Sequence, residues 1–169
     1  MATPIRICGV GSPFGDDQIG WQAIEALERS KVLEVLPTGM VTTCLCDRPG
    51  PRLLEILKGA ELGIIIDAMM SGATPGTLKC VQFDSLSVFE SPYSTHGFDL
   101  ASTLALGAAL EELPPQLFIY GIEIEAPTVN SQNTVSNPAL AAAIPELIKA
   151  IENTLKVFCQ RFFLKKQKG

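Results

Sequence analysis

The chain has 169 residues, of which 47% are hydrophobic and 18% charged, and its mean hydropathy is +0.27. These values exclude a disordered protein, and the length suits a domain that buries a core without disulfides or a structural metal. The net charge of −5 and the isoelectric point near 4.9 argue against a general nucleic-acid binder, which normally carries a basic surface. No run approaches the roughly 18 apolar residues of a membrane span, and the first residues lack a signal-peptide pattern. We therefore expect a cytoplasmic protein without nucleic-acid or membrane partners.

Strand-like and helix-like patterns alternate along the chain, which is typical of an α/β layer fold. Apolar, β-branched runs bounded by turn residues predict strands over 5–10, 40–45, 62–69, 77–83 and 117–124. Apolar residues three or four positions apart predict helices over 15–30, 53–57 and 100–111, and a last helix through 147–162. We predict a single domain over residues 1–164 and a basic, solvated tail over 165–169.

Two prolines bear on the last helix. Asn137 and Pro138 form a favourable pair for its N-cap and first turn. Pro145 lacks the N–H group that a helix interior requires, so we expect it to kink or break the helix near its start.

The glycines after the first predicted strand only partly match a dinucleotide-binding fingerprint. Gly9 and Gly11 occupy the first two positions of G-x-G-x-x-G, but the third position holds Phe14. Asp16 and Asp17 follow where a diphosphate would approach the helix, and their charge would repel it. A nucleotide-binding module is therefore a disfavoured alternative.

Acidic and imidazole side chains come from three separate segments that an α/β fold brings toward one edge. Asp16 and Asp17 follow the first strand, Asp67 lies near the end of an apolar strand, and His96 precedes a helix. Functional groups gather at the carboxyl ends of strands in open α/β sheets. Two aspartates and one histidine are a suitable ligand set for a divalent metal with open coordination positions. The alternative is a capping aspartate, a solvated one and a histidine of the surface or core.

Four motifs follow one another along the chain: GVGSPFGDDQIG after the first strand, IIIDAM in the third, STHGFDL before a helix and YGIEIE on the last strand. Together, in this order and over nearly the whole length, they resemble those of the nickel-iron hydrogenase maturation endopeptidases. That family removes the C-terminal extension of the hydrogenase large-subunit precursor after nickel insertion. The resemblance implies a three-layer α/β/α sandwich around a twisted, mostly parallel mixed sheet. This chain departs from the family in having Ser12 where asparagine is common, and in a loop from Gly11 to Asp17 that is one residue shorter.

The resemblance also implies roles for individual residues. Asp17, Asp67 and His96 would contact the metal, and the two aspartates would belong to the catalytic site. The nickel would come with the precursor, which is the implied partner, and the protein would carry no permanently bound metal. Asp16 is the nearest spare carboxylate, so we take it as the candidate for holding or activating the attacking water; helix capping is its alternative role.

One other hypothesis about the function stays open. The same fold suits a metal-independent hydrolase acting on another ester or amide.

Cys44 and Cys46 form a C-x-C pair at the end of the second strand, but without a second pair this is weak evidence for a zinc site. We expect the five cysteines to be reduced and the chain to act as a monomer.

Overall fold

The computed structural model describes residues 3–13, 15–83, 97–125 and 137–167. Within these ranges, five strands form one sheet in the order β2-β1-β3-β5-β4. Strands β1, β2, β3 and β5 are parallel to one another, and β4 is antiparallel to β5. The sheet is therefore mixed and mostly parallel, as predicted. The strands are β1 (Ile5–Gly11), β2 (Val41–Asp47), β3 (Leu62–Met69), β4 (Leu78–Gln82) and β5 (Gln116–Glu123).

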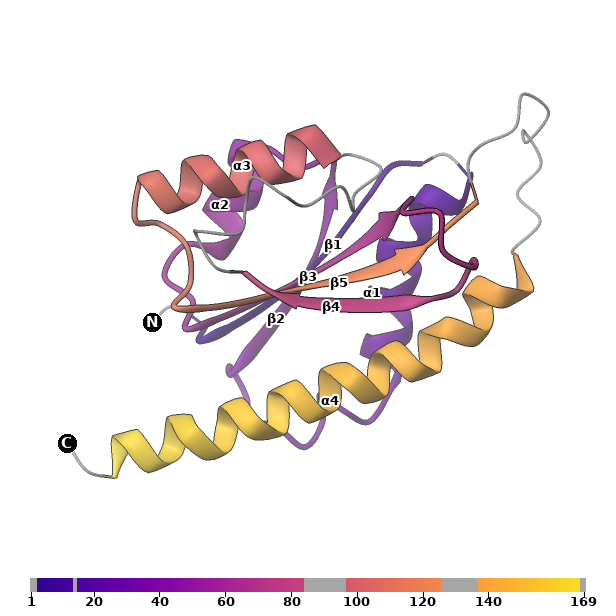
Figure 1. The fold of residues 1–169 in the computed structure, drawn as a ribbon. Helices are drawn as coiled ribbons and strands as arrows, with labels where there is room; N and C mark the ends of the chain where they lie inside the picture. The colour runs from indigo at the N-terminus through magenta and orange to yellow at the C-terminus, as the bar shows by residue number, and fades with distance from the viewer. Residues whose placement is uncertain (1–2, 14, 84–96, 126–136, 168–169) are drawn as a thin grey trace.

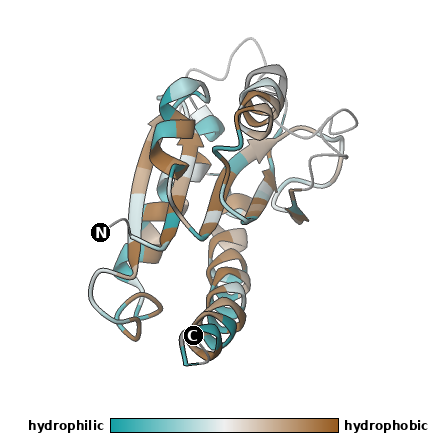
Figure 2. Cartoon of the chain, turned by 90° about the vertical axis from the view of Figure 1, so that its left-hand side faces the viewer, coloured by the Kyte–Doolittle hydropathy of each residue, from teal (hydrophilic) through white to brown (hydrophobic). Residues whose placement is uncertain are grey.

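Helices cover both faces of the sheet, which confirms the three-layer arrangement (Figure 1). The helices are α1 (Ile19–Arg29), α2 (Pro51–Leu57), α3 (Gly97–Ala109) and α4 (Pro138–Lys166), with a 3₁₀ turn, η1 (Gly15–Gln18), before α1. One apolar cluster joins α1 and α4 to one face of the sheet, and a second joins α2 and α3 to the other. Figure 2 shows the hydrophobic colour concentrated on the strands between the helical layers.

The central strand β3 is buried along its whole length. All eight of its residues are buried, because β1 and β5 flank it and helices cover it on both faces. A strand buried on both faces is a continuous apolar run, and LGIIIDAM matches that pattern except at Asp67. An acidic residue in this position has a large desolvation cost unless polar groups surround it.

A close backbone approach joins α1 to the sheet. A Cβ atom at Gly20 would lie 2.8 Å from Ile66 O and closer still to Val10 O, and a Cβ atom at Gly9 would collide with Gly20 O. Glycine is needed at both positions because any side chain would push the helix away from β1 and β3. The two glycines therefore fix where α1 begins, and with it the loop that carries Asp16 and Asp17.

Several predicted boundaries shift in the structure. The predicted helix over 15–30 is divided between the 3₁₀ turn η1 and α1. The predicted strand over 40–45 continues to Asp47 as β2, because its pairing with β1 runs on to the register Gly11–Asp47. The pairing with β1 cannot be predicted from the residues of β2 alone.

The sequence predicts that Pro145 kinks or breaks the last helix. Helix α4 runs without interruption through Pro145, so the break is wrong, whereas the kink stays a prediction (Figure 1). The side chain of Asn137 accepts a hydrogen bond from Ala139 N at 3.0 Å, and Pro138 occupies the first turn, as predicted. Buried side chains on both sides of Pro145, including Leu140 and Leu147, anchor the helix to the sheet and α1. This packing outweighs the lost hydrogen bond, which costs about 3 kcal/mol in an isolated helix.

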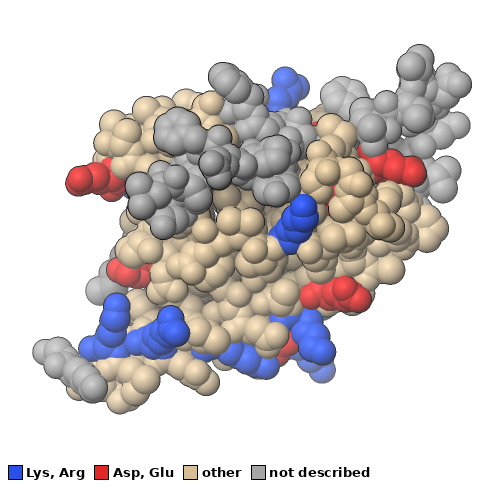
Figure 3. Space-filling model, in the orientation of Figure 1, with Lys and Arg blue, Asp and Glu red and all other residues tan. Residues whose placement is uncertain are grey.

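The described part of the chain contains no helix long and apolar enough to cross a bilayer. Lysine and arginine side chains lie along the side of the molecule that α4 occupies (Figure 3). Helix α4 continues to Lys166, so the first residues of the segment predicted as a tail belong to its last turn.

Replacing Gly20 by alanine tests the close approach of α1. We expect Gly20→Ala to lower the free energy of unfolding by about 2–3 kcal/mol, because the new methyl group meets two backbone oxygens that cannot move independently. Urea denaturation followed by circular dichroism measures the change. Gly50→Ala is the matched control, since a Cβ there meets nothing within 4 Å and the backbone is extended. Equal stabilities for the two variants would contradict the assignment.

Candidate active site

The switch point of the sheet lies between the carboxyl ends of β1 and β3. From β1 the chain passes through α1 to β2 on one side, and β3 lies on the other side. Crevices form at such points because the connections leave in opposite directions, and ligands bind there in open α/β sheets. The turn η1 packs against both β1 and β3, which brings the loop with Asp16 and Asp17 beside the strand that carries Asp67.

Asp17 is oriented by the loop that precedes it. Ser12 is buried and its Oγ donates a short hydrogen bond to Asp17 Oδ2. Gln18 Nε2 donates to Pro13 O at 2.8 Å, which closes the same loop. A Cβ at Gly11 would lie 2.6 Å from the carbonyl oxygen of Asp17, so glycine is required there. Through its hydrogen bond, Ser12 holds the carboxylate of Asp17 in place.

The N-cap position of α1 is occupied by Gln18, and its side chain makes no capping hydrogen bond. Asp16 and Asp17 lie in η1, one turn before the α-helix. Their carboxylates remain close to the positive end of α1, which favours negative charge, without occupying the N-cap position.

Asp67 lies on the sheet face that α2 and α3 cover. Its neighbours Ile66 and Ala68 belong to the cluster under α1 and α4, so alternation along the strand directs Asp67 to the opposite face. The side chain is 2% exposed. Its negative charge acts on Cys46, which belongs to the cluster on this face.

His96 lies outside the described residues, so its approach to the two aspartates stays a prediction. Helix α3 begins at Gly97, the next residue, and it packs on the sheet face that carries Asp67. The helix begins near the carboxyl edge of the sheet (Figure 1). Among the described residues, no group of three or more histidine, cysteine or acidic side chains is arranged to hold a metal ion.

A further carboxylate that the sequence analysis missed lies near Asp16. Burial raises the pKa of Asp16, and the negative charge of Glu125 raises it further. Glu125 is exposed and follows β5. The sequence did contain a signal for Glu125. It is the last residue of the YGIEIE motif, which covers the end of β5, and β5 ends at the same edge of the sheet as β1 and β3. The edge therefore carries acidic groups from three elements.

The second missed residue is Glu123, a buried acid that fixes the turn after β3. Its side chain is 1% exposed, and Oε1 accepts hydrogen bonds from the backbone N–H groups of Ser71, Gly72 and Ala73 at 2.7, 2.8 and 3.1 Å. Ser71 Oγ donates to Oε2 at 2.8 Å. Burial alone would raise the pKa of Glu123, but the hydrogen bonds from Ser71 and the two following N–H groups outweigh it and lower the pKa.

These features define an open α/β protein whose switch point is lined by carboxylates, where a dinucleotide-binding fold would have a phosphate cradle. Comparisons with known proteins give the particular family. A model described as hydrogenase maturation protease matches residues 48–154. The chain belongs to the hydrogenase maturation protease family.

Individual relatives agree with this assignment. The chain is 29% identical over 126 residues to the hydrogenase expression/formation protein HupD of Thiocapsa roseopersicina, a match that covers 70% of this chain and 53% of that protein. The chain thus spans about half the length of this curated relative. It is also similar to the hydrogenase maturating endopeptidase HybD of E. coli, with a TM-score of 0.72, 25% identity and coverage of 90% and 91% of the two chains. The [NiFe] hydrogenase maturation protease HybD of Thermococcus kodakarensis shares the fold, with a TM-score of 0.64, 17% identity and coverage of 89% and 97%.

Replacing Glu123 by glutamine tests the buried carboxylate. The amide presents a donor group toward hydrogen-bond donors, so we expect Glu123→Gln to lower the free energy of unfolding by about 1–3 kcal/mol at neutral pH. Because the folded pKa is lowered, the stabilisation is present above the unfolded pKa of about 4.3 and is lost as the pH falls through the folded pKa.

The difference between wild type and Glu123→Gln should therefore shrink in acid, as measured by urea denaturation at several pH values. Glu25→Gln is the control, because Glu25 makes an exposed ion pair with Arg29 and should change stability little. A wild-type advantage that persists unchanged far into acid would count against a buried, ionised Glu123.

Proposed function

We propose that this protein is an endopeptidase that removes the C-terminal extension from a nickel-loaded precursor of a nickel-iron hydrogenase large subunit. The observation that carries the proposal is the placement of Asp17 and Asp67 on neighbouring elements of the switch point, in a chain that belongs to the hydrogenase maturation protease family. The names of the relatives support the same activity and the same class of partner.

The nickel ion arrives as part of the substrate. Asp17, Asp67 and His96 are the residues proposed to bind it, since carboxylates and a neutral imidazole are suitable ligands for a divalent transition metal. Ser12 supports this role by holding one carboxylate oxygen of Asp17, so that the other oxygen has a defined direction. A buried Asp67 supports it as well, because a bound cation offsets the cost of burying a carboxylate.

Binding the nickel also positions the bond to be cut. The ion is bound to the precursor. Coordination of the ion by residues near the ends of β1 and β3 would therefore hold the scissile peptide at a fixed distance from the protein. Such positioning lowers the barrier by converting an encounter into a reaction within one complex. A precursor without nickel would lack this anchor, and the protein would thereby distinguish finished from unfinished substrate.

Asp16 is the proposed residue for the attacking water. It is half-buried in η1, next to Asp17, and its pKa is raised by burial and by Glu125. A carboxylate of raised pKa is a better proton acceptor than an ordinary one. It would accept a proton from water as the water attacks the peptide carbonyl, and Asp67 and Asp17 would hold the substrate.

The proposal includes cytoplasmic action as a monomer on a folded precursor.

The chief alternative is a metal-independent hydrolase with the same fold. Titration with nickel or cadmium discriminates between them, because such a hydrolase would show no binding that depends on Asp17 and His96. A nucleotide-binding module would instead be stabilised against heat by a dinucleotide at modest concentration.

The direct test is cleavage of the precursor. Purified protein is incubated with nickel-loaded and with nickel-free precursor, and the loss of the C-terminal extension is followed by mass spectrometry. We expect cleavage of the nickel-loaded form alone. Asp17→Asn, Asp67→Asn and His96→Ala should each lower the rate by roughly 10²-fold or more, because the metal-bound substrate is no longer positioned.

Glu25→Gln is the matched control for these variants, since it removes an exposed carboxylate on α1 far from the strand ends. Unfolding curves of all variants separate loss of activity from loss of fold. Equal cleavage of the nickel-free precursor, or full activity of His96→Ala, would refute the nickel-recognition proposal.

Asp16→Asn separates water activation from metal binding. We expect it to lower kcat by roughly 10²–10⁴-fold, since the amide does not accept the proton, while the concentration of nickel-loaded precursor at half-maximal rate changes little. Asp17→Asn should instead raise that concentration. Steady-state cleavage kinetics measure both quantities, and an Asp16→Asn variant with unchanged kcat would assign Asp16 to a structural role.

A further inference from the structure

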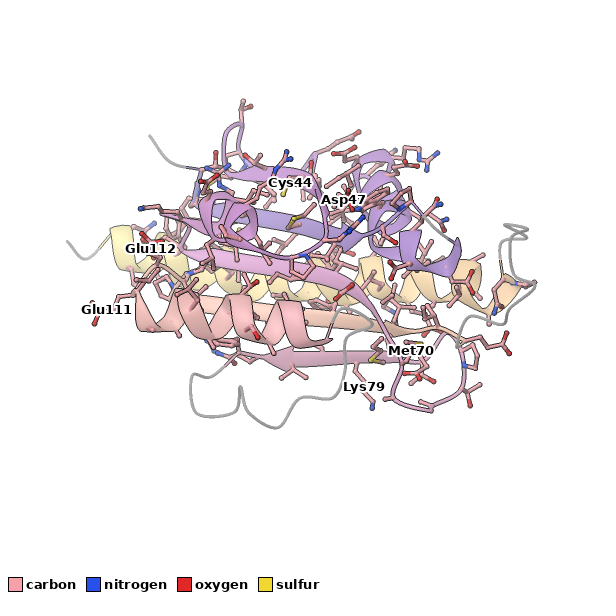
Figure 4. All side chains as sticks on the ribbon, turned by 90° about the horizontal axis from the view of Figure 1, so that it is seen from above. Cys44, Asp47, Met70, Lys79, Glu111 and Glu112 are labelled. Carbon is pink, nitrogen blue, oxygen red and sulfur yellow. The ribbon has the colours of Figure 1, made fainter. Side chains whose placement is uncertain are left out.

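Three cysteines meet on one face of the sheet, next to the candidate site. Cys8 on β1 is the register partner of Cys44 on β2, and Val10 is the partner of Cys46 two residues farther along. The three thiols belong to the apolar cluster that α2 and α3 cover. Figure 4, drawn from that side, shows Cys44 on β2 with Asp47 farther along the same strand.

The thiol of Cys8 interacts with both of the other thiols. Hydrogen bonds with Cys44 and Cys46 and burial raise the pKa of Cys8. The hydrogen bond from Cys8 lowers the pKa of Cys44; burial opposes this, and the positive charges of Arg6 and Arg52 assist it. Cys8 therefore remains a thiol. The Cys44 thiol donates a hydrogen bond to Ile7 O at 3.6 Å in the structure, and it is the more readily ionised member of the pair.

Strand geometry makes Cys8 and Cys44 the pair suited to a covalent bond. Register partners on neighbouring strands have Cα atoms about 4.8 Å apart, within the range of roughly 4.4–6.8 Å that a disulfide spans. Cys44 and Cys46 are two residues apart on one extended strand, or about 6.6 Å, at the upper end of that range, and their parallel side chains do not point toward each other. The described cysteine, histidine and acidic side chains form no set suited to a metal ion, so these thiols are better arranged for pairwise chemistry.

We infer that Cys8 and Cys44 are a redox-reactive pair that hydrogen peroxide converts into a reversible disulfide between β1 and β2. Cys44 is the residue that peroxide oxidises first, because it is half-buried, whereas Cys8 and Cys46 are fully buried. All five cysteines carry free thiols in the structure, which is the reduced state of this pair. The inference is independent of the peptidase activity proposed above.

The chemistry proceeds in two balanced steps. The Cys44 thiolate attacks one oxygen of hydrogen peroxide, the O–O bond breaks, hydroxide leaves, and Cys44 becomes a sulfenic acid. The sulfur of Cys8 then attacks the sulfur of Cys44; the S–S bond forms, the S–O bond breaks, and hydroxide leaves with the Cys8 proton as water. The two thiols lose two electrons in total, and peroxide is reduced to water. A dithiol reductant returns both residues to thiols.

The test uses the intact wild-type chain. The protein is treated with a modest excess of hydrogen peroxide, remaining thiols are alkylated, and a non-reducing digest is analysed by tandem mass spectrometry. We expect a linked peptide pair joining Cys8 to Cys44, and its disappearance after treatment with dithiothreitol.

Single serine variants assign the roles. In Cys8→Ser the sulfenic acid on Cys44 has no resolving thiol, so it should be trapped by dimedone at that residue. In Cys44→Ser the linked pair should be absent. Cys46→Ser should retain the Cys8–Cys44 link, and Cys159→Ser on α4 is the matched control that should behave as wild type. Circular dichroism verifies that each variant is folded.

The wild-type experiment alone is sufficient to overturn the inference, whatever the stability of the variants. If the folded wild-type chain forms no Cys8–Cys44 link when treated with peroxide, the inference is overturned. A link from Cys8 to Cys46 in its place would also overturn it, as would a dimedone adduct confined to Cys80 or Cys159.

Discussion

The close contact between α1 and the two central strands is the constraint on which the rest of the structure depends. Gly9 and Gly20 let backbone meet backbone, so the first turn of α1 lies against β1 and β3 with no side chain between them. The chain between these glycines must then turn sharply at the carboxyl edge, and η1 is that turn. The positions of Asp16 and Asp17 beside the strand of Asp67 follow directly. A sequence motif that resembles a phosphate cradle serves here to bring carboxylates to the edge.

The acidic groups of this edge are held by different means. Asp17 takes a hydrogen bond from Ser12, Asp67 lies within the buried strand, and Glu123 is surrounded by N–H donors. A buried carboxylate with several hydrogen bonds is stable as an anion, so Glu123 acts as a structural support for the turn that follows β3. Asp16 has less support and its pKa is raised. Environments that differ this much are consistent with the different roles proposed for these residues, since a ligand requires a fixed charge and a base must exchange protons.

The layered fold could be predicted from the sequence because its signals are local. Alternating patterns predicted the strands and helices, whereas the site that the motifs place at the carboxyl ends of β1 and β3 stays a prediction. The division of 15–30 into η1 and α1 depends on contacts with β1 and β3, and the extension of β2 to Asp47 depends on pairing with β1. The uninterrupted α4 depends on packing around Pro145. Glu123 was missed because the N–H groups that it binds lie some fifty positions earlier in the chain. Glu125 was missed because Asp16, on which its charge acts, lies more than a hundred positions earlier.

Helix α4 carries the chain away from the carboxyl edge. Its 29 residues rise about 1.5 Å each, so its two ends are roughly 40 Å apart, and its last turns lie at the opposite side of the sheet from the acidic groups (Figure 1). Its deeply buried side chains end at Phe158. A fusion partner, fluorophore or surface tether joined to the last turns of α4 would therefore lie away from the carboxyl edge of the sheet, where the candidate site is.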